Sequence, residues 1–209
     1  MSRPIVINIA SGHYAGAEQI SESIKEKLQG IFKHEIKMIN LNERAKSPKQ
    51  YSDKDYDFNK IIKEIECLPS TSGLVIVLVY GCYSIYDAKL NELSSLKVYV
   101  DSDGDKRLIN MLNQESVNAS EELAACITHY MDRLRPEMIT YVEPSKAHAD
   151  IILPSMNDNL GTAIIVDGIV KVVEQHQGGE LKESPTLFPH LDFNIERLEM
   201  ESERYYDLS

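Results

Sequence analysis

The chain has 209 residues, of which 43% are hydrophobic and 26% are charged, and it carries a net charge of −11. This length and composition predict one soluble α/β domain with a sizeable core. The acidic balance offers no basic surface for nucleic acid or anionic lipid by default, and no run of Lys and Arg indicates a local basic patch. No apolar stretch reaches the ~18 residues of a membrane span, and no signal-peptide pattern opens the chain. We therefore expect neither nucleic acid nor a membrane as a partner.

Three cysteines, Cys67, Cys82 and Cys126, are scattered without the spacing of metal ligands. An odd, scattered set is typical of buried thiols in a reducing compartment. We therefore expect a cytoplasmic location, or a nuclear one.

Apolar runs alternate with helical patterns through most of the chain. The patterns predict strands at residues 5–9, 34–41, 74–79, 96–100 and 149–153, and helices at 20–32, 57–67, 87–93, 107–113, 121–135 and 162–174. The polar residues 42–56 are predicted to form a loop. Strands that alternate with helices predict a parallel sheet flanked by helices. We assign residues 1–175 to this domain and residues 176–209 to an acidic C-terminal tail.

The first predicted strand is followed by two glycines, Gly12 and Gly16, and then by a helix. This order is typical of a phosphate-binding loop, because amides at the start of the helix point at the anion. Aligned with the P-loop motif, Ser11 takes the first Gly position, Ala17 the Lys position and Glu18 the Ser/Thr position. Losing a cation ~4 Å from a phosphate costs roughly 4 kcal/mol at an effective dielectric of 20, and Glu18 adds repulsion.

Other polar residues have two readings. His13 is a candidate phosphate donor, although an exposed loop histidine is the simpler interpretation. Glu18 at a helix N-terminus stabilises the helix by 0.3 to ~1 kcal/mol without any ligand. Asp101, Asp103 and Asp105 precede a predicted helix, and this spacing is typical of capping rather than of a metal site.

A longer pattern runs from residue 75 to residue 163. It contains the sequences VIVLVYG (75–81), YMDRLRP (130–136), YVEPSKAHADIILP (141–154) and NDN (157–159). In order and spacing these motifs resemble the uridine/cytidine kinase family of P-loop nucleoside kinases, and with the first strand the resemblance covers residues 4 to 165. It implies a P-loop kinase fold, ATP with magnesium, and phosphorylation of the 5′-hydroxyl of uridine.

The resemblance also implies catalytic groups that this chain replaces. The family has an aspartate after the second strand that orients or deprotonates the sugar hydroxyl. The best alignment places Tyr51 there, and Asp53 or Asp55 fits only with a gap. A family glutamate at the end of the third core strand corresponds to Tyr80.

The lid and the sugar-binding hairpin of the family are altered as well. The family lid carries arginines that clamp phosphates, since guanidinium groups match phosphoryl oxygens. Matched position by position, these arginines fall on Asn110, Met111, Asn113, Gln114, Ala119 and Glu121, and none is basic. The hairpin has no room between residues 65 and 74. We therefore expect both the lid and the hairpin to be reduced or lost.

A set of candidate site residues follows from the loop and from the resemblance. Tyr86 matches a tyrosine that stacks on the base, and Arg135 and Lys146 are also retained, while Glu143 to Lys146 is expected to join a helix to a strand. No catalytic residue and no metal ligand is predicted. The predicted substrate-binding residues are Tyr86 and Arg135, and the predicted nucleotide-site residues are Gly12, His13, Gly16, Ala17 and Glu18.

These departures predict a uridine-kinase-like protein with degenerate ATP and catalytic sites, a binding or regulatory homologue in pyrimidine nucleoside metabolism. No cofactor is expected, and the partner is itself or a paralogous nucleoside kinase subunit, with uridine or a nucleotide as ligand. Two alternatives stay open. A divergent active uridine kinase would use ATP and Mg²⁺, with Lys106, Arg107 or Arg135 supplying positive charge. A nucleotide or nucleoside sensor would bind without turnover.

Overall fold

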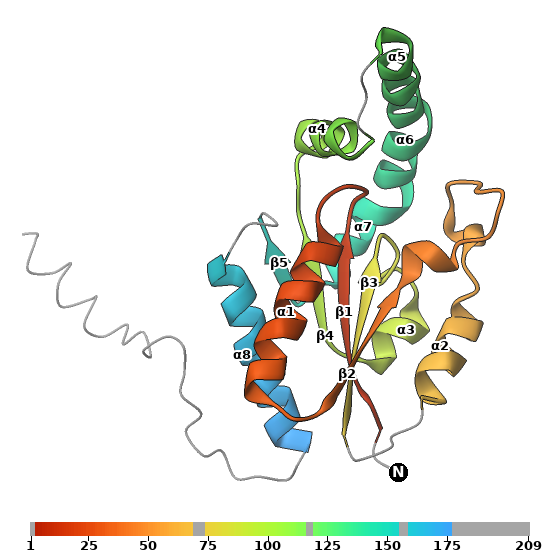
Figure 1. Ribbon diagram of the computed structural model, residues 1–209. Coiled ribbons are helices and arrows are strands. Elements are labelled where there is room, and N and C mark those ends of the chain that lie inside the picture. The colour runs from red at the N-terminus through yellow and green to blue at the C-terminus, as the bar shows by residue number, and fades with distance from the viewer. Residues whose placement is uncertain (1–2, 69–73, 116–118, 155–158, 177–209) are drawn as a thin grey trace, which may run out of the picture.

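Five parallel strands form one sheet in the computed structural model, which describes residues 3–68, 74–115, 119–154 and 159–176 (Figure 1). The strands, in the sheet order β2-β3-β1-β4-β5, are β1 (Ile5–Ser11), β2 (Glu35–Asn40), β3 (Val75–Gly81), β4 (Ser94–Val100) and β5 (Ile151–Leu153). Every pairing is parallel, which confirms the predicted α/β fold. The predicted tail, residues 176–209, lies outside the described residues except for His176.

Helices cover both faces of this sheet (Figure 1). One face is covered by α1 (Ala17–Ile31) and α8 (Asn159–His176), and the other by α2 (Phe58–Glu66) and α3 (Ala88–Leu93). Side chains alternate between the faces along each strand, so Ile7 and Leu78 join the α1/α8 core while Val77 joins the α2/α3 core. Both β1 and β3 are buried along their whole length, which explains their continuous apolar runs.

A helical arm stands beyond the carboxyl ends of the strands (Figure 1). The arm, whose described residues are 104–115 and 119–148, contains α4 (Gly104–Gln114), α5 (Ser120–His129), α6 (Arg135–Glu137) and α7 (Glu143–Ser145). Two π-helical turns, Tyr130–Leu134 and Met138–Val142, join α5, α6 and α7, and a 3₁₀ turn at Lys146–His148 leads towards β5. π-helical turns are rare in proteins, and those that occur often lie at functional sites. Within the described ranges, no helix is long and apolar enough to cross a membrane.

Two connections between these elements can be compared with the sequence predictions. The loop predicted at 42–56 contains 3₁₀ turns at Leu41–Arg44 and Asp53–Asp55. Residues 67–74 connect α2 to β3, where the resemblance would place a hairpin, and residues 69–73 of this connection lie outside the described part of the chain.

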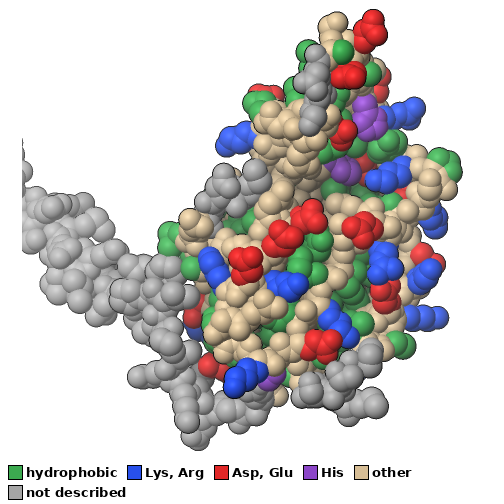
Figure 2. All heavy atoms as spheres, in the orientation of Figure 1, with side chains coloured by type: hydrophobic (Ala, Val, Ile, Leu, Met, Phe, Trp, Pro, Cys, Tyr) green, Lys and Arg blue, Asp and Glu red, His purple; other side chains and the backbone are tan. Residues whose placement is uncertain are grey.

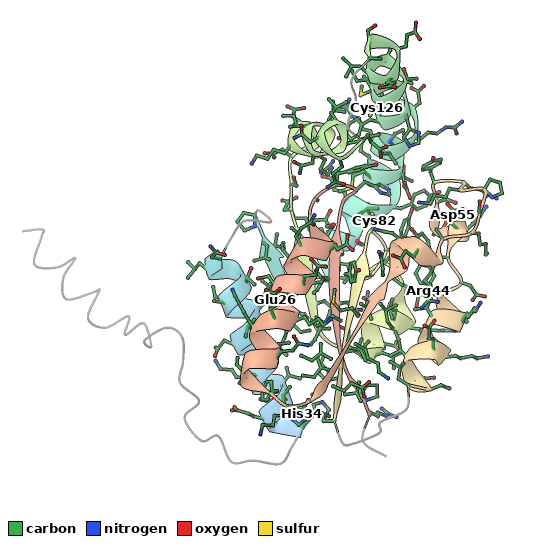
Figure 3. All side chains as sticks on the ribbon, in the orientation of Figure 1. Glu26, His34, Arg44, Asp55, Cys82 and Cys126 are labelled. Carbon is green, nitrogen blue, oxygen red and sulfur yellow. The ribbon has the colours of Figure 1, made fainter. Side chains whose placement is uncertain are left out.

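The cysteines are less buried than predicted. Cys82 is buried directly after β3, as expected, but Cys67 is exposed and Cys126 is half-buried on the arm (Figure 3). The prediction of buried thiols is therefore wrong for Cys67, because residue type alone does not fix which side of a helix end meets solvent.

Replacing Ile7 by Ala is expected to lower the free energy of unfolding by about 3 kcal/mol, because Ile7 is fully buried and the change leaves a cavity at the centre of the sheet. Ile164 on α8 is 46% exposed and serves as the matched control. Its replacement by Ala should cost less than about 0.5 kcal/mol. Urea denaturation measures both values, and equal losses would contradict the central position of β1.

Candidate functional site

The phosphate loop, residues 11–18, lies where β1 ends and α1 begins. Gly16 precedes α1 with a positive φ of 90°, a conformation that residues with a Cβ rarely adopt. A Cβ on Gly12 would lie 2.9 Å from Cδ of Arg107 and 2.9 Å from the sulfur of Met138. The predicted strand, turn and helix are confirmed, and the arm packs directly on the loop.

A cavity of about 280 Å³ opens at the phosphate loop. The five predicted nucleotide-site residues, Gly12, His13, Gly16, Ala17 and Glu18, all line it. Its other walls come from the ends of β2 and β3, the loop after β2, and the arm, with the side chains of Asn40, Asn42, Lys49, Tyr51, Tyr80, Gln114, His129 and Leu134. Sequence reasoning missed Lys49 and His129, because a polar loop and a helix end give no signal of what they face.

Charges of both signs surround this cavity. Glu18 lies in the first turn of α1 and accepts a hydrogen bond from the Tyr80 hydroxyl at 3.4 Å. Burial, and then the charges of Glu18 and Glu43, raise the pKa of Tyr80 to about 12, so this phenol stays protonated. Lys49 brings an ammonium to the lining. Figure 2 shows Lys and Arg interspersed with Asp and Glu over this face of the molecule.

His13 ties the phosphate loop to the arm through a buried network. Its Nε2 lies 2.8 Å from Oε2 of Glu137, and its Nδ1 lies 3.5 Å from the sulfur of Cys82. The Tyr83 hydroxyl donates to the other Glu137 oxygen at 2.9 Å, and the Glu137 side chain is only 4% exposed. Burial lowers the pKa of His13, but Cys82 and then Glu137 outweigh burial and raise it to about 10. His13 is therefore a protonated link rather than the exposed loop histidine that the sequence favoured.

Tyr14 makes a second connection between loop and arm. The Asn110 side chain donates to the Tyr14 carbonyl at 2.9 Å, and the Tyr14 hydroxyl donates to Oε1 of Glu115 at 2.9 Å. Tyr14 keeps a positive φ of 58°, which costs of order 1 kcal/mol in a residue other than glycine. Its ring packs beside a small apolar cluster that includes Met111 and Tyr130. The arm therefore bonds to the loop from α4, where the resemblance would place lid arginines.

Known proteins share both the motifs and the fold of this chain. The model of the phosphoribulokinase / uridine kinase family matches residues 36–162. The chain belongs to this family. "Putative uridine kinase DAS2" of Saccharomyces cerevisiae is 40% identical over 225 residues, which cover 98% of this chain and 96% of that protein.

A further relative and a solved structure match less of this kinase-family chain. A "Uridine kinase" of Saccharomyces cerevisiae is 34% identical over 113 residues, 53% of this chain and 22% of that protein. The crystal structure of phosphoribulokinase from Rhodobacter spheroides has a TM-score of 0.51 and 11% identity, covering 73% of this chain and 70% of that one. The second likeness shows the fold alone.

Three residues compete for the position of the family's catalytic aspartate, and the structure separates them. Tyr51 lines the loop cavity. Asp55 is 3% exposed and accepts the backbone amides of residues 50–52, so it holds its own loop in shape (Figure 3). Asp53 accepts the Tyr86 hydroxyl at 3.4 Å. Neither aspartate is among the described residues that line the cavity.

The two predicted substrate-binding residues lie apart from the loop cavity. Tyr86 belongs to an aromatic cluster, with ring centroids 5.4 to 6.2 Å from those of Phe58, Tyr83 and Tyr141. Arg135 is exposed on the arm. Neither is among the described lining residues. A motif match assigns a segment to a site, but packing decides which way each side chain points.

Glu143 to Lys146, at the end of the arm, connect helix to strand, as predicted, and Lys146 donates to Asp101 after β4. The predicted capping role is wrong for the Asp103 side chain. Asp103 occupies the N-cap position of α4 but makes no capping hydrogen bond, and its carboxylate lies 3.4 Å from Nζ of Lys106. Ion pairing with a lysine competes with capping for the same oxygens.

The residues at the loop do not fit ATP with magnesium in the way the P-loop motif binds them. Ala17 offers no ammonium to the β- and γ-phosphates, and Glu18 places a carboxylate where a hydroxyl would bind the metal. The Glu18 carboxylate also interacts favourably with the positive end of the α1 dipole, which would otherwise favour an anionic ligand. Among the described residues, no group of three or more His, Cys, Asp or Glu side chains is arranged to hold a metal ion.

Replacing His13 by Ala is expected to lower the free energy of unfolding by about 2 kcal/mol near pH 6, because it removes a charged hydrogen bond to buried Glu137. Folding raises the pKa of His13 to about 10. The stabilisation is therefore full below the ordinary imidazole pKa of about 6.5 and is lost as the pH rises through the folded value.

Urea titrations near pH 6, 8 and 10 measure this difference between wild type and variant. Exposed His148 provides the control, and its replacement by Ala should change stability by less than about 0.5 kcal/mol at each pH. A His13→Ala cost that stays constant or grows with pH would contradict the charged pair.

Replacing Asn110 by Ala is expected to speed amide hydrogen exchange about fivefold in α4 and in residues 12–16, because the lost bond to Tyr14 contributes about 1 kcal/mol. Mass spectrometry of exchanged peptides measures the rates. Asn113 lies exposed on the same helix, and Asn113→Ala should leave them unchanged. Equal rates in both variants would show that this bond does not hold the arm on the loop.

Proposed function

We propose that this chain is a uridine-kinase-like protein that binds its ligands or partners without transferring phosphate. The observation that carries the proposal is the position of Glu18, which lines the cavity beside Ala17 at the start of α1. A carboxylate ~4 Å from a phosphate repels it by roughly 4 kcal/mol at an effective dielectric of 20. The missing lysine removes an attraction of similar size from the same place.

Residues on other elements support this proposal. Tyr51 lines the cavity where the family alignment expects an aspartate, and a phenol is a poor replacement for a carboxylate base near neutral pH. From α4, Gln114 lines the cavity and Asn110 bonds to Tyr14, so these two lid positions offer amides instead of guanidinium groups. Phosphoryl transfer rests on positioning and charge neutralisation, and both are weakened here.

The family and its relatives supply the biological setting of the proposal. We place the chain in pyrimidine nucleoside metabolism, in the cytoplasm or the nucleus, as a regulatory or binding homologue. Its proposed ligand is uridine or a nucleotide, because the relatives bear the name of uridine kinase. Its proposed partner is a second copy or a paralogous nucleoside kinase subunit.

A second candidate function is a divergent active uridine kinase that transfers the γ-phosphate of ATP to the 5′-hydroxyl of uridine with Mg²⁺. The observation in its favour is the basic side chains near the loop. Lys49 and His129 line the cavity, and Arg107 packs against Gly12. These groups would have to bind the phosphates in place of the P-loop lysine.

Purified protein is expected to show no ATP-dependent phosphorylation of uridine, and calorimetry with ATP and Mg²⁺ is expected to show no binding in the sub-millimolar range, because Glu18 repels the phosphates. The double variant Ala17→Lys, Glu18→Thr should also stay inactive, since the aspartate and the lid arginines are still missing. An active uridine kinase serves as the assay control.

Continuous turnover by wild type that is abolished by changing Gly16 would overturn the proposal in favour of the active kinase. Turnover by the double variant would show that the positions outside the loop matter less than argued. Thermal stabilisation by uridine or UTP, but not by unrelated nucleosides, would identify a sensor that binds without turnover.

A further inference from the structure

The outer side of the arm carries a line of exposed residues that are four positions apart. Its members are Leu123, Ile127, Met131, Arg135 and Ile139, which we call the ridge; the four apolar ones are 38% to 58% exposed. Residues four apart drift by about 40° per step around an α-helix. The two wider π turns drift the other way and compensate for this, so the ridge stays on one side of the arm.

The ridge has no covering element in the described part of the chain. No residue of α5 is buried, and Figure 1 shows α5 projecting away from the sheet. Arg135 forms no ion pair with a described residue, and its guanidinium lies 3.8 Å from the sulfur of Met131. Contiguous exposed apolar side chains around one arginine are typical of a surface that binds another protein segment.

The C-terminal segment of the sequence has the complementary pattern. Phe188, Leu191, Ile195 and Leu198 follow at spacings of three, four and three, the pattern of a helix that buries one seam. Pro189 suits the first turn of such a helix. The positions that flank the seam include Asp192, Glu199 and Glu201. An apolar seam with acidic flanks matches an apolar ridge that carries an arginine.

The length of chain before this segment favours a second copy as its source. Eleven residues, 177–187, separate α8 from Phe188, and they span at most about 40 Å. α8 is about 27 Å long and runs from β5 to the end of the sheet opposite the arm (Figure 1). It also packs on the opposite face of the sheet from Met138 at the base of the arm. The linker is therefore short for reaching the ridge of its own copy.

We propose that residues 188–201 of one copy dock along the ridge of a second copy, with their apolar residues against the ridge and their acidic side chains against Arg135. The inference rests on the self-association named in the proposed function and not on the loss of phosphoryl transfer. A turnover assay therefore leaves it untouched, and the experiment below leaves the turnover question untouched.

Light scattering of the full chain over a concentration series tests the proposal. Wild type is expected to form a dimer that dissociates on dilution, and the tail variant Ile195→Asp, Leu198→Asp and the ridge variant Ile127→Asp should each raise the dissociation constant at least about tenfold. Met200→Asp outside the seam and Ile31→Asp on α1 are matched controls that should not, since Ile31 is 52% exposed and lies off the arm. Circular dichroism checks that each variant is folded.

A charge swap gives a sharper test. Arg135→Glu is expected to weaken the dimer about tenfold, and combining it with Asp192→Arg or Glu199→Arg should restore affinity to within about threefold of wild type. Rescue by Asp192→Arg indicates that residues 188–201 run antiparallel to the ridge, and rescue by Glu199→Arg that they run parallel to it. Lys63→Glu on α2 controls for net charge.

Three results would overturn the proposal. One is a wild-type chain that stays monomeric up to about 100 µM, which includes docking of the tail on its own copy. The second is a dimer whose affinity the tail and ridge variants leave unchanged. The third is a charge swap in which neither double variant recovers affinity.

Discussion

Burial of β1 on both faces is the constraint on which the rest of the structure depends. This strand pairs with β3 on one side and β4 on the other, and all seven of its residues are buried. A strand held in this way ends at a fixed point, and the next residues must form the loop that leads to α1. The cavity, the position of Glu18 and the contact with the arm all follow from that point.

The phosphate loop is fixed by contacts with the arm as well as by its connections to β1 and α1. His13 bonds to Glu137 and Tyr14 bonds to Asn110 and Glu115, so the arm and the loop share polar contacts as well as packing at Gly12. In phosphoryl transfer by P-loop enzymes, the loop amides and cations hold a ligand. In this chain, a protonated imidazole in the loop holds an internal carboxylate. The polar groups of His13 and Tyr14 in the loop therefore have hydrogen-bond partners within the protein itself.

Sequence patterns predicted the elements well, because a buried parallel sheet leaves continuous apolar runs and its helices leave a clear periodicity. The strands at β1, β3 and β4 and the helices α4 and α5 lie where these patterns indicated, but the helical part of the arm continues to His148, beyond the helix predicted at 121–135. Side-chain roles were predicted less well. His13 was expected to be exposed, but it bonds to Glu137, which is distant in the chain. Asp103 was expected to cap a helix, but its carboxylate lies beside Lys106. Cys67 was expected to be buried, but it is exposed at the end of α2.

The sequence by itself determined the fold class, the family resemblance and the residues at the phosphate loop, because these are local patterns or fixed spacings. Only the tertiary structure decided which residues share the cavity: Lys49, Tyr51 and His129 join the loop, while Tyr86 and Arg135 do not. The physical reason is that a cavity is enclosed by side chains from several elements. Their directions are set by the packing of those elements against the sheet, which no single stretch of sequence contains.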